Sequence, residues 1–340
     1  MTSDRAVAPV RLAIVGAGGI AKTYAEILGG AFAVPARAVG VVDVDVDAAA
    51  AMADGLGVPH HASAEALLEA VDAVDDLDAV VVCTPPNTHP AMVDLFTGRG
   101  VHVLCEKPLA VDAAQARAMV ELAAGRSVVL AMATKFRYCQ DIVTATEMAR
   151  AGTFGELRLV ENAFTSRVDM SNRWNSNPEI SGGGVLVDNG THSVDLLRYV
   201  LGPLTELIAI EQARPSSMRV DDCVRVHLRS ESGVDASVDL AWSIDKSLGD
   251  FLKIFGTEGE ARIGWRESGW RHYGGEWHSI GPGYAKHPAM GGALAQFCLA
   301  VRGVEPVAVT GDDAIAAACA IDAAYDSLRS GGWSKIALVP

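Results

Sequence analysis

A glycine-rich turn between an apolar segment and a helical pattern constrains this chain's fold more than any other feature. Val10–Val15 is a short, mainly apolar run, and it leads into GAGGIA at residues 16–21, which matches the spacing G-x-G-x-x-G/A. In such a turn Gly16 permits the tight bend, Gly18 lets the backbone approach a pyrophosphate, and small Ala21 lets the helix pack on the strand. The pattern predicts a dinucleotide site, in which the helix N-terminus offers N–H groups to the phosphates.

An acidic residue after the next apolar run supports this interpretation. Ala38–Val42 has the pattern of a buried strand, and Asp43 follows it at the distance expected for the ribose-binding acid, about 20 residues on. A carboxylate there accepts hydrogen bonds from the adenosine ribose and repels a 2′-phosphate. No Arg or Lys occurs within Val44–Ala53. We therefore expect NAD as cofactor; NADP stays open, because a basic residue from elsewhere could supply the missing charge.

Strand-like and helix-like segments alternate through the first third of the chain. The runs Ala79–Cys83, Val101–Cys105 and Val128–Met132 are continuously apolar, as strands buried on both faces are. Helical patterns separate them. We expect an α/β protein whose residues 1–133 form a doubly wound Rossmann domain, with helices on both faces of a parallel sheet.

The pattern changes after residue 133. Several segments alternate polar with apolar residues, which is typical of an antiparallel sheet with one free face. We expect residues 134–340 to form an α+β domain with an open, mainly antiparallel sheet, interrupted by a helix over about Gly184–Leu201. The segment Arg266–Met290, rich in Gly, Trp and His, is expected to be a loop. The expected strands are Leu157–Phe164, Leu207–Gln212, Cys223–Leu228, Val234–Ser243 and Phe251–Phe255.

Composition excludes several classes of protein. The chain has 340 residues, with 28 Lys and Arg against 42 Asp and Glu, for a formal charge of −14. This balance lacks the clustered positive charge that nucleic acids and anionic membrane surfaces require. No apolar run reaches the ~18 to 20 residues of a membrane span, and no signal-peptide core precedes the first strand. The six cysteines show neither metal-ligand nor disulfide spacing. We expect a cytoplasmic protein without a metal site.

Three further segments, taken with the glycine turn, resemble one known family. They are Cys83–His89 (CTPPNTH), Cys105–Leu109 (CEKPL) and Gly182–His192 (GGGVLVDNGTH). Together they resemble the Gfo/Idh/MocA family of glucose–fructose oxidoreductase, inositol dehydrogenase and rhizopine-catabolism proteins. The resemblance implies a Rossmann domain followed by an α+β domain. It also implies an NAD(P)-dependent oxidoreductase that transfers hydride between nicotinamide and a hydroxyl or keto carbon of a sugar, cyclitol or sugar derivative.

The resemblance makes Lys107, Asp188 and His192 the catalytic set. Asp188 and His192 are spaced i, i+4, so on a helix they share one face and can form a hydrogen bond. Such a bond suits His192 to accept a hydroxyl proton while hydride leaves the same carbon. Lys107 would stabilise the developing alkoxide, and the sequence leaves open whether Lys107 or His192 accepts the proton. We expect these residues to meet in a cleft between the domains, and the resemblance suggests a cis Lys107–Pro108 peptide.

Further residues are expected to line the same site. For the cofactor they are Gly16, Gly18, Gly19, Ile20, Asp43, Thr84, Pro86, Asn87, His89, Glu106 and Lys107. For the substrate they are Lys107, Arg137, Tyr138, Arg173, Trp174, Asn175, Asp188, Asn189, His192 and Asp195. An equally good interpretation makes His89 an ordinary residue at the start of a helix. Ordinary loop or core packing is likewise an equally good interpretation of Arg137, Tyr138, Arg173, Trp174 and Asn175. Two departures from the family pattern, Tyr24 and the segment Lys135–Arg137, leave the substrate open.

Two other functions stay open on the sequence alone. A non-catalytic relative could bind NAD and a sugar as a sensor, although it would not need the acid–base set at Lys107, Asp188 and His192. A lyase or glycosidase could use tightly held NAD for a transient oxidation, and it would accumulate no NADH.

The alternating strands also bear on assembly. An open sheet with an apolar outer face near Cys223–Ser243 would aggregate unless covered. We therefore expect a homodimer or homotetramer.

Overall fold

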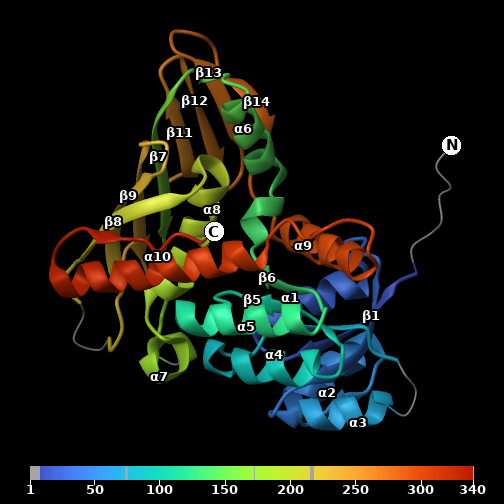
Figure 1. Ribbon diagram of the computed structural model, residues 1–340. Coiled ribbons are helices and arrows are strands. Elements are labelled where there is room, and N and C mark those ends of the chain that lie inside the picture. Colours follow the sequence, from blue (N-terminus) through green and yellow to red (C-terminus); the bar gives the residue numbers. More distant parts are fainter. Residues whose placement is uncertain (1–7, 73–75, 172, 215–217, 340) are drawn as a thin grey trace, which may run out of the picture. The chain divides into compact units, whose positions relative to one another are not determined.

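The computed structural model describes residues 8–72, 76–171, 173–214 and 218–339, which form two compact units (Figure 1). Unit 1 comprises Met1–Leu109, Arg117–Lys135 and Met290–Gly311, and unit 2 comprises Ala110–Ala116, Phe136–Ala289 and Asp312–Pro340. The expected division after residue 133 lies close to the change of unit at Phe136, but the chain returns to unit 1 near its end. Residues 1–7, part of the segment in which the sequence predicts no signal-peptide core, lie outside the described residues.

Unit 1 is built on a parallel sheet with the strand order β3-β2-β1-β4-β5-β6. The order reverses between β1 and β4, which is the point where open α/β sheets bind ligands beyond the carboxyl ends of their strands. The strands are β1 (Val10–Val15), β2 (Ala36–Val42), β3 (His60–His61), β4 (Ala79–Val82), β5 (His102–Glu106) and β6 (Leu130–Ala133). The helical segments are α1 (Gly19–Glu26), η1 (Ile27–Ala31), α2 (Val46–Leu56), α3 (Ala64–Asp72), η2 (Pro86–Thr88), α4 (His89–Thr97), α5 (Ala113–Gly125) and α9 (Lys286–Val301).

The strands of this sheet are buried on both faces. All of Ala79–Val82 in β4, together with Leu12 and Ile14 in β1, have 0% exposure. Tyr24 of α1 and Phe297 of α9 pack into the same apolar cluster as β1. Each large aliphatic side chain buried in this way contributes about 1.5–3 kcal/mol. The expected doubly wound Rossmann domain is confirmed, and α9 completes its core from the far end of the sequence.

Unit 2 contains a mixed sheet with the order β14-β13-β12-β11-β7-β10-β9-β8-β15. Among the described strands of this sheet, only β7 and β10 pair in parallel, so the expected open, mainly antiparallel sheet is confirmed. The strands are β7 (Leu157–Thr165), β8 (Leu204–Glu211), β9 (Cys223–Ser230), β10 (Asp235–Ala241), β11 (Asp250–Gly256), β12 (Gly259–Gly264), β13 (Ser268–His272), β14 (His278–Gly281) and β15 (Ser334–Lys335). The helical segments are η3 (Lys135–Tyr138), α6 (Gln140–Arg150), η4 (Trp174–Ser176), α7 (Pro178–Ser181), η5 (Leu186–Gly190), α8 (Thr191–Leu201) and α10 (Gly311–Ser330).

The two faces of this sheet differ in polarity. On β9 and β10 the buried side chains, such as Val226 and Val238, are apolar. The opposite face carries cross-strand ion pairs: Arg225 binds Asp239 at 2.6 Å, and Arg229 binds Asp235 at 3.2 Å. The expectation of an apolar outer face was therefore wrong. On these two strands the alternating positions carry charged side chains instead.

The expectation of a loop over Arg266–Met290 was also wrong. It contains the strands β13 and β14 and the start of α9. The preceding strand, β12, was not anticipated either. Its residues Gly259–Gly264 are almost all buried, so they lack the alternation that marked the other strands.

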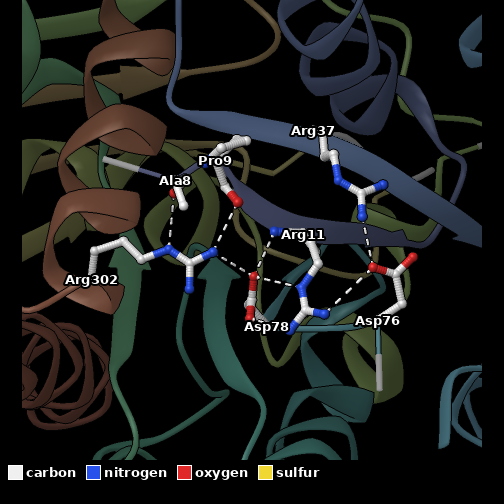
Figure 2. A network of polar contacts seen from close by, with 7 residues as sticks. All are labelled: Ala8, Pro9, Arg11, Arg37, Asp76, Asp78 and Arg302. Atoms are coloured by element: carbon white, nitrogen blue, oxygen red, sulfur yellow. Dashed lines mark hydrogen bonds and ion pairs between the residues drawn. The ribbon is translucent and has the colours of Figure 1, made fainter. Parts of the chain in front are cut away.

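The amino end of the sheet in unit 1 is held together by a network of arginines and aspartates (Figure 2). Asp78, which precedes β4, accepts hydrogen bonds from the backbone and guanidinium of Arg11 at 2.7–3.1 Å. Arg302, which follows α9, binds the same carboxylate at 2.7 Å and also donates to the carbonyls of Ala8 and Pro9. Arg37 and Arg11 both pair with Asp76. The network ties the returning segment to the first strand.

Within the described residues, no helix is both long enough and apolar enough to cross a membrane.

Candidate functional site

The glycine turn lies between β1 and α1 and is closely packed on one side. Gly16 has φ +96°, and a Cβ there would lie 2.9 Å from the Cys83 carbonyl group, so only glycine fits. At Gly18 and Gly19 a Cβ would meet nothing within 4 Å, and both residues are exposed. Gly16 therefore makes the bend, and open backbone follows it at Gly18 and Gly19. Contact of these glycines with a cofactor stays a prediction.

Asp43 is joined to this turn. Its Oδ2 accepts a hydrogen bond of 2.5 Å from the Ala17 backbone, and its Oδ1 accepts one of 2.9 Å from the Asp45 backbone. The carboxylate is thereby held beside the turn at the end of β2, where the sequence placed it. Helix α1 has no side-chain cap at Gly18 and no acidic residue in its first turn. Its N-terminal N–H groups therefore suit the phosphates of a dinucleotide, which when bound supplies a hydride acceptor.

The segment after β4 reaches the same carboxyl edge of the sheet. Thr84 and Thr88 are joined by a 2.7 Å hydrogen bond between their hydroxyls, Pro86 is buried, and Asn87 is exposed. Of these side chains, Asn87 has the freest access to a ligand at this edge. Cofactor contacts by this segment stay a prediction.

His89 is fully enclosed at the start of α4, with 1% exposure. Its Nδ1 lies 3.0 Å and 3.1 Å from the carbonyl oxygens of Pro108 and Leu109, and its Nε2 lies 2.9 Å from that of Thr84. Burial lowers the pKa of His89, and the three carbonyl groups oppose that shift. These contacts favour a role in joining two loops over direct contact with a cofactor.

Lys107 follows β5, and its peptide bond to Pro108 is cis, as the resemblance suggested. The preceding Glu106 is buried and accepts a hydrogen bond of 2.9 Å from the Tyr24 hydroxyl. Burial raises the pKa of Glu106, whereas the charge of Lys107, the Tyr24 hydroxyl and the charge of Lys135 lower it. A buried carboxyl and two lysines thus gather at the carboxyl edge that carries the glycine turn.

Asp188 and His192 lie at the start of the long helical segment of unit 2. Asp188 is half-buried within the π-helical turn η5, and His192, with 7% exposure, lies in the first turn of α8. The expected single helix is therefore a π-helical turn followed by an α-helix, an arrangement frequent at functional sites. The ring of Phe136 packs edge-on against the His192 imidazole, with 5.1 Å between centroids. Phe136 was expected only as a departure from the family pattern.

Arg137 and Asp195, both expected to bind substrate, bind each other. The guanidinium of Arg137 contacts Asp195 at 2.7 Å and Asp313 at 3.0 Å, with its side chain 7% exposed. Burial lowers the pKa of Arg137, but the two carboxylates outweigh this and raise it. Asp313 was missed, because nothing in the sequence links the start of α10 to this site. Contact of Arg137 or Asp195 with substrate stays a prediction.

The remaining residues expected to bind substrate also lie in unit 2. Arg173 and Trp174 are exposed, and Asn175, Tyr138 and Asn189 are half-buried. The expected catalytic set is divided between the units, with Lys107 in unit 1 and Asp188 and His192 in unit 2. The residues expected at the cofactor all belong to unit 1.

Comparison with known proteins gives two family matches. Residues 10–134 match the family described as an oxidoreductase family with an NAD-binding Rossmann fold, and residues 142–262 match the C-terminal domain of the same family, GFO/IDH/MocA. Together these cover more than two thirds of the chain.

Individual curated proteins and solved structures are also similar to this chain. It is 27% identical to inositol 2-dehydrogenase of Rhizobium meliloti (strain 1021), over 94% of this chain and 97% of that protein. It is 33% identical to D-glucoside 3-dehydrogenase of Escherichia coli (strain K12), over 59% of this chain and 57% of that protein. Among solved structures, GenD2 from gentamicin A biosynthesis in complex with NAD has a TM-score of 0.84 and 26% identity, covering 99% of both chains. The chain therefore belongs to the Gfo/Idh/MocA family of oxidoreductases and carries that family's NAD-binding Rossmann domain.

Proposed function

We propose that this protein is an NAD-dependent dehydrogenase that transfers hydride between the nicotinamide and a hydroxyl or keto carbon of a sugar or cyclitol. Lys107, Asp188 and His192 are the proposed catalytic residues. The observation that carries the proposal is the buried imidazole of His192, 7% exposed, in the first turn of α8 directly after the π-helical turn η5 that holds Asp188. Such π-helical turns are frequent at functional sites.

The proposed residues divide the reaction between them. Oxidation of a hydroxyl carbon breaks its C–H and O–H bonds. NAD, when bound, would accept the hydride at its nicotinamide, and the protein would accept the proton. His192, supported by Asp188, or Lys107 takes that proton. Where His192 takes the proton, the Lys107 ammonium stabilises the negative charge that builds up on the oxygen. Family relatives named for inositol and glucoside oxidation support a polyhydroxylated substrate.

A screen for NAD reduction tests the proposal. The purified protein is incubated with NAD and a panel of inositols, aldoses and amino sugars, and NADH is followed by absorbance. We expect NADH to accumulate with at least one polyol, and the rate to fall by about 10² or more in the His192→Ala variant. The matched control is His272→Ala, which removes an exposed histidine on β13. Substrate consumption without NADH would favour a lyase or glycosidase, and binding without consumption would favour a sensor.

We also propose that the protein forms a homodimer or homotetramer through the open face of the sheet in unit 2. That face has a hollow of about 420 Å³, lined by residues that include Arg225, Asp239, Lys246 and Lys253. Charges of both signs allow two copies of the same face to pair. Sedimentation at micromolar concentration tests this, and a monomer would contradict it. The double variant Arg225→Glu with Lys253→Glu should dissociate the oligomer.

A further inference from the structure

The glycine triplet before the helical segment of unit 2 is packed against two other parts of the chain. Gly182 has φ +77°, a backbone conformation that residues with a side chain rarely adopt. A Cβ at Gly183 would overlap the hydroxyl of Tyr325 in α10, and a Cβ at Gly184 would overlap the backbone of Asp221. These glycines are therefore needed so that Asp221 and Tyr325 can approach the start of η5.

Asp221 binds three successive backbone N–H groups at this point. Its Oδ1 accepts from Gly184 at 2.8 Å, its backbone carbonyl accepts from Val185 at 2.9 Å, and its Oδ2 accepts from Leu186 at 2.8 Å. N–H groups at the start of a helix have no partner within the helix. One residue with 2% exposure satisfies them here, and its negative charge also suits the positive end of the helix dipole.

Tyr325 fixes the Asp221 carboxylate from the other side. Its hydroxyl donates to Asp221 Oδ1 at 2.6 Å and accepts from the Gly184 backbone at 3.1 Å. The next bond along the chain runs from the Asp188 backbone N–H to the Gly184 carbonyl at 3.0 Å. Tyr325, Asp221, Gly184 and Asp188 are thus linked by consecutive hydrogen bonds.

We propose that Asp221 and Tyr325 are positioning residues, which fix the π-helical turn so that Asp188 and His192 hold their catalytic geometry. This inference rests on the proposed function. A general base must be held within a few tenths of an ångström of its working position, and misplacement by about 1 Å can cost 10²-fold in rate. Neither residue lies in a segment that carries the family motifs.

The Tyr325→Phe and Asp221→Asn variants test the proposal. Tyr325→Phe removes one hydrogen bond to the carboxylate, and Asp221→Asn replaces one acceptor oxygen with an NH₂ group that faces a backbone donor. We expect kcat to fall about 3- to 10-fold in Tyr325→Phe and about 10- to 100-fold in Asp221→Asn, the scale seen for residues that orient a catalytic group. Affinity for NAD should not change, because the proposed cofactor residues lie in unit 1.

The pH dependence of kcat separates positioning from mere stabilisation. If Asp188 no longer supports the imidazolium form of His192, the acid limb of the profile moves to lower pH in both variants. The matched control is Tyr273→Phe, which removes a 3.1 Å hydrogen bond from an exposed tyrosine to the Gly256 carbonyl. It should change neither kcat nor the profile.

The outcomes distinguish this inference from the proposed function. A lower Tm with wild-type kcat and pH profile in Tyr325→Phe would overturn the positioning role, while inactivity of His192→Ala would still support the function. Near-wild-type turnover by His192→Ala would overturn both. If Asp221→Asn does not fold, Tyr325→Phe decides the matter.

Discussion

The Tyr24 hydroxyl donates a hydrogen bond of 2.9 Å to Oε1 of Glu106, the buried residue that precedes Lys107. This bond helps Glu106 to carry a negative charge inside the sheet, because burial alone raises the pKa of that carboxyl. The carboxylate is in turn a counter-charge for Lys107. Tyr24 thus acts on the proposed catalytic lysine through one intervening residue.

Tyr24→Phe should therefore change the pH dependence of the reaction. Loss of the hydroxyl raises the pKa of Glu106 further, so its negative charge is lost at a higher pH as the solution is acidified. We expect the acid limb of the kcat profile, measured over about pH 5 to 9, to move to higher pH and kcat to fall several-fold. An unchanged profile would mean that Glu106 does not act on Lys107.

Cofactor choice should follow Asp43. Val44, its neighbour, has 91% exposure, so a basic residue there can reach a 2′-phosphate. Asp43→Ser with Val44→Arg should shift preference from NAD toward NADP, because a repelling charge is replaced by an attracting one. Fluorescence titration of both cofactors measures the shift. Tighter binding of NADP than NAD by the unmodified protein would contradict the role of Asp43.

Loss of the His89 ring should weaken both NAD binding and turnover. His89→Leu removes the ring that joins the Thr84 carbonyl to those of Pro108 and Leu109. Both loops are then less well fixed, so we expect NAD affinity and kcat to fall together, each by about tenfold. His60→Leu, an exposed position in unit 1, is the control. Wild-type NAD affinity in His89→Leu would show that the ring only fills space.

The network in Figure 2 should stabilise the protein in a pH-dependent way. Burial raises the pKa of Asp78, but hydrogen bonds from Arg11 and Arg302 outweigh it and hold that pKa well below its usual range. A carboxyl group whose pKa is lower in the folded protein than in the unfolded chain stabilises the fold at pH values above its unfolded pKa of ~3.9. This stabilisation disappears as the pH falls toward the pKa of the group in the folded protein.

Asp78→Asn should therefore lower the free energy of unfolding at neutral pH by about 1–3 kcal/mol, since a partly exposed charged hydrogen-bond network is lost. Urea denaturation at several pH values should show a deficit that persists down to about pH 4 and shrinks below it. Asp326→Asn, at an exposed pair with Arg329, should have little effect. A deficit independent of pH would contradict the assignment to Asp78 ionisation.

The sequence predicted the Rossmann domain because its signals are local. The glycine turn, Asp43 and continuously apolar strands each specify the structure of their own segment. Helix α9 lies far along the chain from that domain, and no sequence pattern shows that it packs on the first sheet rather than the second. Placing it requires the apolar cluster around Tyr24 and Phe297, which are far apart in the chain.

The candidate site was predictable only where family motifs mark it. Lys107, Asp188 and His192 lie in such motifs. The two residues proposed to position Asp188 and His192 do not: Asp221 and Tyr325 are 104 residues apart, and their meeting depends on how α10 packs within unit 2. Likewise, the charged outer face of the sheet depends on register, which pairs Arg225 with Asp239 across two strands.

The most direct test of the central claim is the kcat of Lys107→Ala, His192→Ala and the double variant, measured with the best substrate of the screen alongside the Kd for NAD. We predict that His192→Ala lowers kcat by about 10² or more with the NAD Kd unchanged, because it removes a general acid–base group. Lys107→Ala should cost a similar factor, and the double variant should lose less than the product of the two, because residues that act as one unit are not additive. Near-normal turnover in either single variant would contradict the proposed catalytic set.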